Sequence, residues 1–147
     1  MHKIVATFFG LGYAPKASGT IGALGGILVY GALRWLGINN WLFLLLLLIL
    51  FFLGVYSFSE VEEVWGKDNG KVVIDEVVGI WVSLLYIPFQ LEYYLLGFVL
   101  FRILDIWKPL LIRKTEKLKS GWGVMADDLL AGIYTNLILQ ALLLWSK

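Results

Sequence analysis

The chain has 147 residues, of which 60% are hydrophobic and 16% are charged, and its formal net charge is +1. With a mean hydropathy of +0.82, this composition excludes an ordinary soluble globule and predicts an integral membrane protein. The chain has no cysteine and its only histidine is His2, so we expect neither disulfides nor thiolate or histidine chemistry. The length suits one domain over residues 1–147. We expect a membrane partner and no nucleic-acid partner.

The first part of the chain predicts a short apolar segment, a polar loop and two apolar helices. Within residues 1–19, the loop GLGYAPKASGT contains glycines and a proline that oppose a regular helix. Residues 21–37 then form a glycine-rich apolar segment, and glycines allow close helix packing in lipid. Residues 41–59 are almost entirely apolar and are about as long as the ~20 residues that cross a bilayer core.

Three more helical segments carry acidic or basic residues near one end. Residues 72–87 form a segment that ends before Pro88, because proline disfavours helical geometry in the residue before it. Residues 91–108 and 125–145 form two further segments, and the basic stretch 110–119 between them is amphipathic and suits the membrane surface. The polar residues of these segments are Asp75 and Glu76, then Arg102, Asp105 and Lys108, and finally Asp127 and Asp128.

The predicted fold is an all-α membrane protein with about five transmembrane or membrane-embedded helices, a short N-terminal apolar segment and an amphipathic surface segment. If successive segments cross the membrane in alternate directions, all of these polar ends lie on one face. The basic residues lie toward the same face, with the exceptions of Arg34 and Lys147. This bias predicts that the polar face is cytoplasmic.

The acids of this face form a candidate metal site. Like charges that lie close together cannot all stay ionised unless something offsets them. Ligands that offer only oxygen suit a hard cation, and Mg²⁺ also shares its coordination shell with phosphate. The acids could instead be interfacial ion pairs, an alternative that the pattern alone leaves open. The expected metal ligands are Glu60, Asp75, Asp105 and Asp128.

Two basic residues and a loop are candidates for binding phosphate. Arg102 and Lys108 each stand three residues from Asp105, so the three side chains share one helix face, and both cations suit phosphate oxygens. The glycine-rich loop, with Lys16, Ser18 and Thr20, could position the same phosphate beside a helix N-terminus. A carboxylate-held metal beside phosphate-binding cations predicts phosphoryl chemistry. The expected catalytic residues are Asp75, Glu76, Asp105, Asp127 and Asp128, with Asp127 or Glu76 orienting water.

Three blocks of the sequence resemble the phosphatidylglycerophosphatase A family: GLGYAPKASGTIGALGG, KDNGKVVIDEVVGIW and FRILDIWKPLLIRKTEKLKSGWGVMADDLLAG. The resemblance implies a Mg²⁺-dependent lipid phosphatase that hydrolyses phosphatidylglycerol phosphate to phosphatidylglycerol and inorganic phosphate. It further implies a multi-pass protein of the bacterial cytoplasmic (inner) membrane whose active site faces the cytoplasm. The family's functional acids map onto Asp75, Glu76, Asp105, Asp127 and Asp128, and its phosphate-side cations map onto Arg102 and Lys108.

Two alternative functions use similar residues. A CDP-alcohol phosphotransferase also uses intramembrane acids and a divalent metal, but the sequence lacks the D-G-x₂-A-R…G-x₃-D-x₃-D run of that family. A small divalent-cation carrier would place polar groups through the depth of the membrane. Residues 41–59 and 125–145 carry almost none beyond their ends, which disfavours the carrier.

Overall fold

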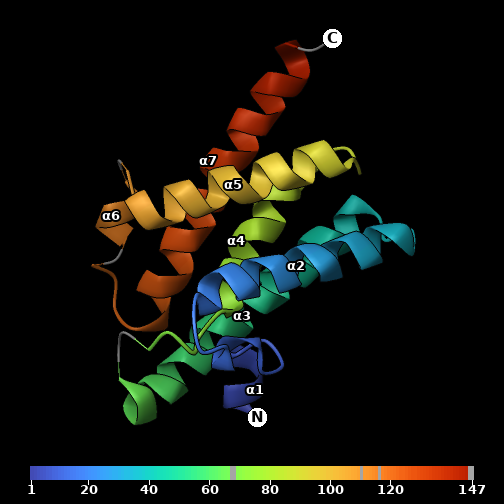
Figure 1. The fold of residues 1–147 in the computed structure, drawn as a ribbon. Coiled ribbons are helices and arrows are strands. Elements are labelled where there is room, and N and C mark those ends of the chain that lie inside the picture. The colour runs from blue at the N-terminus through green and yellow to red at the C-terminus, as the bar shows by residue number, and fades with distance from the viewer. Residues whose placement is uncertain (67–68, 110, 116, 146–147) are drawn as a thin grey trace.

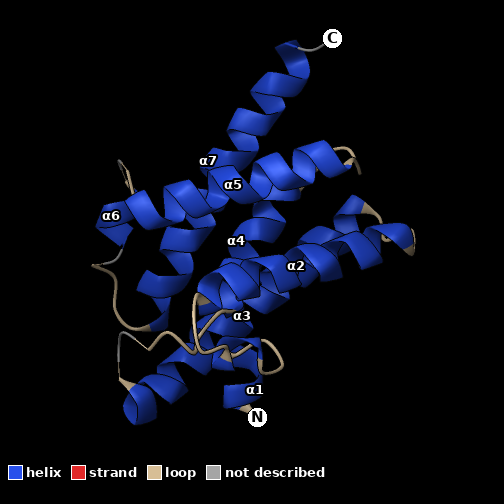
Figure 2. Cartoon of the chain, in the orientation of Figure 1, coloured by secondary structure: helices blue, strands red, loops and turns tan. Residues whose placement is uncertain are grey.

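The computed structural model describes residues 1–66, 69–109, 111–115 and 117–145, which form helices and no β-strand (Figure 2). The all-α prediction is confirmed. In chain order the elements are α1 (His2–Ala6), the 3₁₀ helix η1 (Leu11–Tyr13), α2 (Ser18–Trp35), α3 (Asn40–Trp65), α4 (Ile74–Leu84), α5 (Leu91–Trp107), α6 (Ile112–Thr115) and α7 (Gly121–Trp145) (Figure 1).

The five longest helices correspond to the five predicted segments, although several of their ends differ. Helix α3 continues beyond the apolar stretch 41–59 to Trp65. Helix α7 begins at Gly121, one turn before its predicted start. Helix α4 has only 11 residues, fewer than the predicted segment 72–87. The predicted surface segment 110–119 contains α6, and residues 110 and 116 lie outside the described residues.

Two of the described helices, α3 with 26 residues and α7 with 25, are long and apolar enough to cross a membrane. The expected count of about five membrane helices is therefore not confirmed. Helix α4 is too short to cross alone, because 11 residues rise only ~16 Å against a hydrocarbon core of ~30 Å. The outer faces of the long helices expose many large apolar side chains, which suits contact with lipid. Examples are Leu45, Phe52, Leu95, Val99, Leu137 and Leu142.

Helix α4 lies at the centre of the bundle. Nine of its residues are buried, and it contacts α2, α3, α5 and α7 (Figure 1). Its most extensive contact is with α7. Because apolar residues cover nearly every side of α4, it is a core helix of the bundle, and the two acids of its first turn are held in a fixed position.

Two glycines bring α4 and α7 into backbone contact. A Cβ atom on Gly132 of α7 would lie 2.3 Å from the carbonyl oxygen of Gly79 in α4, and a Cβ on Gly79 would lie 2.8 Å from the carbonyl oxygen of Asp128. Any larger residue at Gly132 would push the helices apart, as expected for small residues at membrane helix crossings. Asp75 precedes Gly79 by one turn, and Asp128 precedes Gly132 by one turn. The crossing therefore places the two carboxylates side by side.

The C-terminal end of α4 is satisfied by side chains of its neighbours. The last carbonyls of a helix have no partner within it, and in a membrane water is not available to replace one. The hydroxyl of Tyr30 in α2 donates to the carbonyl of Leu84 at 2.8 Å. The side-chain amide of Asn136 in α7 donates to the carbonyls of Val82 (3.1 Å), Ser83 (3.0 Å) and Leu85 (2.7 Å). These bonds allow α4 to end inside the bundle.

Candidate active site

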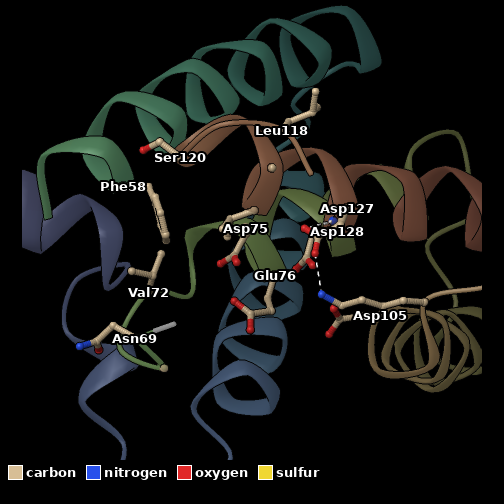
Figure 3. A pocket seen from close by; sticks show the side chains of 14 residues that line it. Phe58, Asn69, Val72, Asp75, Glu76, Asp105, Leu118, Ser120, Asp127 and Asp128 are labelled. Carbon is tan, nitrogen blue, oxygen red and sulfur yellow. Dashed lines mark hydrogen bonds and ion pairs between the residues drawn. The ribbon is translucent and has the colours of Figure 1, made fainter. Parts of the chain in front are cut away.

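A cavity of about 490 Å³ lies where the end of α3, the start of α4, the end of α5 and the start of α7 meet. Asp75 and Glu76 enter it from α4, Asp105 from α5, and Asp127 and Asp128 from α7 (Figure 3). The predicted gathering of these five acids is confirmed. The other residues that line the cavity are Phe58, Asn69, Gly70, Val72, Lys108, Leu118, Ser120, Gly123 and Val124.

Three of the acids form a compact cluster suited to a metal ion. Asp75, Glu76 and Asp128 each offer a carboxylate oxygen, and these oxygens all lie within 4.8 Å of one another. One oxygen of each residue (Oδ1, Oε2 and Oδ2 respectively) is buried without a hydrogen-bond partner. Burying unpaired carboxylates is costly unless protons or a cation neutralise them. An all-oxygen donor set of this kind fits Mg²⁺.

The pKa values of the two acids on α4 show the effect of this uncompensated negative charge. Burial raises the pKa of Asp75 well above its usual value, and the neighbouring Glu76 adds to the effect. Burial also raises the pKa of Glu76 to about 7, although a hydrogen bond with Asp75 and the charge of Arg102 partly oppose it. Without a cation, the cluster therefore retains protons near neutral pH.

The other two acids are paired with the predicted phosphate-binding cations. Asp105 accepts a short hydrogen bond from Arg102 Nη1 within α5. Asp127 accepts one from Lys108 Nζ at 2.6 Å, and its other oxygen accepts the backbone N–H of Asp128 at 2.9 Å. These pairs hold both cations beside the unpaired cluster. Asp105 and Asp127 thus each have a cation at hydrogen-bond distance, whereas Glu76 of the cluster has a longer ion pair of 4.0 Å with Arg102.

Arg102 and Lys108 are both arranged to meet an anion. Arg102 Nη1 lies 4.0 Å from Glu76 Oε1, and its Nε is buried without a hydrogen-bond partner, but Arg102 is not among the described residues that line the cavity. Lys108 ends α5 in the left-handed conformation, with φ 49° and ψ 56°. A left-handed residue commonly ends a helix, but this backbone is less favourable for lysine than for glycine.

The start of α2 packs against the same cluster through Gly19. A Cβ atom at this position would lie 2.2 Å from Glu76 Oε1 and 3.2 Å from Arg102 Nη2. A larger residue here would displace the ends of the Glu76 and Arg102 side chains. Sequence reasoning did not select Gly19, although the glycine-rich block in which it stands was a signal for close backbone contact.

Glu60 does not reach the site, which corrects its prediction as a metal ligand. The side chain is exposed and is absent from the residues that line the cavity. At this end of α3 the buried face carries Ser57, Phe58 and Val61, and the exposed Glu60 does not lie on that face. Glu62 instead faces α7 and accepts a short hydrogen bond from Ser120. The carboxylate cluster thus contains Glu76, which was not a predicted ligand, and lacks the predicted ligands Glu60 and Asp105.

The predicted phosphate-binding loop lies beside the acid cavity. Lys16 and Ser18 line a neighbouring cavity of about 410 Å³ that shares Asn69 and Gly70 with the first. Thr20 lies in the first turn of α2 and lines neither of these two cavities. Asn69 and Gly70 were not predicted as site residues, and their only sequence signal was that of a turn.

Comparison with known proteins identifies one family. The family model described as phosphatidylglycerophosphatase A matches residues 4–143. The chain is 39% identical to phosphatidylglycerophosphatase A of Haemophilus influenzae and 35% identical to that of Escherichia coli, over 97% and 92% of this chain and 88% and 80% of those proteins. It is also 41% identical to a putative phosphatidylinositol-3-phosphatase of Bacteroides thetaiotaomicron, over 97% of this chain and 92% of that protein. No solved structure matches.

Proposed function

The chain belongs to the phosphatidylglycerophosphatase A family, and we propose that it hydrolyses the terminal phosphate monoester of phosphatidylglycerol phosphate. The products are phosphatidylglycerol and inorganic phosphate. The observation that carries the proposal is the division of the acids in the cavity. Three carboxylates, each with one buried oxygen that has no hydrogen-bond partner, face one another, and the two remaining acids hold an arginine and a lysine beside them.

Asp75, Glu76 and Asp128 would hold Mg²⁺, which supplies charge neutralisation and polarisation at phosphoryl oxygens when it is bound. This ligand set is supported by the three unpartnered oxygens in the cluster. It replaces the earlier expectation of Glu60 and Asp105 as ligands.

Arg102 and Lys108 would bind the phosphate oxygens. Asp105 fixes the guanidinium of Arg102 and Asp127 fixes the ammonium of Lys108, so both cations are positioned before the substrate arrives. Preorganised charges of this kind stabilise a transition state without reorganisation during the reaction. Asp105 and Asp127 therefore act by positioning the cations, which assigns Asp127 a different role from the water orientation expected from the sequence.

The overall reaction is a hydrolysis at phosphorus. The oxygen of water forms a new P–O bond, the bond between phosphorus and the lipid alcohol oxygen breaks, and that alcohol oxygen takes up a proton. The developing negative charge lies on the phosphoryl oxygens, next to Arg102 and Lys108.

A second candidate substrate is a phosphatidylinositol 3-phosphate. It is favoured by the identity of 41% to the Bacteroides thetaiotaomicron protein named for that activity. Both lipids carry a phosphate monoester on a polyol headgroup, so the same site chemistry applies to either. Family membership disfavours a CDP-alcohol phosphotransferase and a cation carrier.

The proposed location is the bacterial cytoplasmic (inner) membrane, in a multi-pass arrangement with the cavity facing the cytoplasm. The support is the basic character of the chain around the cavity end, where Lys16, Lys71, Arg113 and Lys114 are exposed. Exposed basic residues on one side favour the cytoplasmic side and attract anionic lipid headgroups.

The test is phosphate release by the purified protein from phosphatidylglycerol phosphate and, separately, from phosphatidylinositol 3-phosphate. Release from each lipid is measured with Mg²⁺ and with EDTA, and the same measurements are made on a folded Asp128→Asn variant. Release from the first lipid that needs Mg²⁺ and Asp128 supports the proposal. Phosphate release that is unaffected by EDTA would contradict the metal site. Release from phosphatidylinositol 3-phosphate alone would make that lipid the substrate in place of phosphatidylglycerol phosphate.

A further inference from the structure

The cavity next to the acid site has the opposite charge. It measures about 410 Å³ and is lined by the loop that joins η1 to α2 and by the turn before α4. Lys16 comes from the first of these and Lys71 from the second, and both side chains are exposed. No acidic side chain is among the described residues that line it. An anion is therefore the ligand class that this cavity suits.

The two cavities share a wall. Asn69 and Gly70 line both of them, and a Cβ atom on Gly70 would lie 3.6 Å from Ser18 Oγ. A single molecule bound across this wall would therefore present one group to the carboxylate cluster and another to the lysines.

Backbone contacts hold this second cavity in shape. A Cβ atom on Gly12 would lie 1.8 Å from the carbonyl oxygen of Lys71, so the two loops touch through their main chains. The side chain of Asn69 donates to the carbonyl of Trp65 at 3.0 Å and accepts the N–H of Lys71 at 3.0 Å. The Lys71 ammonium lies 5.4 Å from the centre of the Trp65 ring. The contacts of Gly12 and Asn69 involve only the backbone of Lys71 and Trp65, so they remain when the Lys71 side chain is replaced.

We propose that Lys16 and Lys71 bind the internal phosphodiester of the lipid while its terminal phosphate monoester occupies the acid cavity. This inference rests on the proposed function. Phosphatidylglycerol phosphate and phosphatidylinositol 3-phosphate both carry a phosphodiester between diacylglycerol and the polyol that holds the monoester. Two anionic groups separated by a short polyol match two neighbouring cavities with a shared wall. The lysine cavity therefore selects lipids with two phosphates over phosphatidic acid, which has the monoester alone.

The first test compares phosphatidylglycerol phosphate with phosphatidic acid of the same acyl chains, in the full-length protein in mixed micelles. We expect Lys71→Ala and Lys16→Ala to lower kcat/KM for phosphatidylglycerol phosphate about tenfold, chiefly through KM, and to leave phosphatidic acid unchanged. Lys71→Arg should retain most of the selectivity because it retains the charge. Lys114→Ala removes an exposed charge of α6 outside both cavities and serves as the matched control.

The second test uses product inhibition, which does not depend on a poor substrate being turned over. Of the two products, phosphatidylglycerol retains the phosphodiester but not the monoester, and inorganic phosphate has no phosphodiester. Lys71→Ala should weaken inhibition by phosphatidylglycerol and leave inhibition by inorganic phosphate unchanged. Equal losses with both lipids and both inhibitors, or an effect matched by Lys114→Ala, would overturn the proposal. Absence of phosphate release from any lipid by the unsubstituted protein would instead refute the proposed function.

Discussion

Gly132 and Gly79 meet backbone to backbone, and a Cβ atom on Gly132 would lie 2.3 Å from the Gly79 carbonyl oxygen. Each glycine stands one turn after an acid of the carboxylate cluster. The distance between α4 and α7 at this crossing therefore sets the distance between Asp75 and Asp128. The geometry of the candidate metal site therefore depends on these two glycines.

Gly132→Ala should separate the helices and damage both stability and activity. Overpacking a tight contact costs ~1–3 kcal/mol, which a lower thermal midpoint in detergent would report, and Mg²⁺-dependent phosphate release should fall with it. Gly31→Ala is the control, because a Cβ there would meet its nearest atom, in Phe89, at 3.6 Å. A Gly132→Ala protein with normal stability and activity would show that the crossing tolerates more separation than the structure indicates.

Asp128→Asn and Asp105→Asn should impair the enzyme in different ways. Asp128 belongs to the unpaired cluster, so its amide variant should bind Mg²⁺ at least about tenfold more weakly, which calorimetric titration can measure. Asp105 is paired with Arg102, so Asp105→Asn should keep its Mg²⁺ affinity and lose turnover. Equal loss of metal affinity in both variants would return Asp105 to the ligand set.

Lys108→Gly should separate stability from activity. Lys108 has a φ of 49°, and glycine adopts this conformation without the cost of ~1 kcal/mol or more that other residues bear. The variant loses the ammonium that Asp127 holds, so phosphate release should fall sharply. The thermal midpoint should fall less than in Lys108→Ala, because glycine relieves the backbone strain while both variants leave the buried Asp127 without its cation. Lys108→Arg, which keeps the charge but strains the same backbone, is the comparison. Full activity in Lys108→Gly would remove Lys108 from the site.

The metal-free protein should lose stability as the pH rises. Burial raises the pKa of Glu76 from 4.5 to about 7, so the folded state binds more protons than the unfolded state between these values. Stability therefore falls with increasing pH across that window. Thermal melts in EDTA from pH 4.5 to 7.5 should show the decline. Added Mg²⁺ should flatten it, and Glu76→Gln should make it less steep, because the pKa of Asp75 is raised as well. A flat profile in EDTA would mean that the cluster is already neutralised by groups of the protein.

Asn136→Leu should destabilise the bundle. It leaves the carbonyls of Val82, Ser83 and Leu85 without their side-chain donor, at a cost of ~1–3 kcal/mol for buried groups left unsatisfied. Gln140→Leu, one turn further along α7, is the matched control. Equal midpoints for the two variants would show that the end of α4 has other partners.

The sequence predicted much of the site because charge inside an apolar chain is costly. Asp75, Asp105 and Asp128 stand out for this reason, and the alternation of the segments was enough to bring them to one face. Glu60 was misplaced because the sequence places it near the correct end of α3 but does not show that the buried face there carries Ser57, Phe58 and Val61.

Contacts between backbones were less visible in the sequence. Gly79 and Gly132 look like ordinary packing glycines until the crossing of α4 and α7 is known. Asn136 is one polar residue in an apolar helix, and nothing local indicates that its partners lie at the end of α4. The ion pairs of Asp105 and Asp127, which separate positioning acids from candidate ligands, likewise appear only in three dimensions.

The short length of α4 has a consequence for how the enzyme meets membranes of different composition. Asn136 and Tyr30 hold the C-terminal end of α4, and its first turn carries Asp75 and Glu76. A helix of ~16 Å therefore separates these acids from the residues that hold its other end. Hydrophobic mismatch with a thicker or thinner bilayer would tilt the outer helices, while the acids would keep their distance from the middle of the protein. The spacing of Asp75 and Asp128 should therefore change little with lipid chain length, because the contact between Gly79 and Gly132 holds α4 against α7 one turn away.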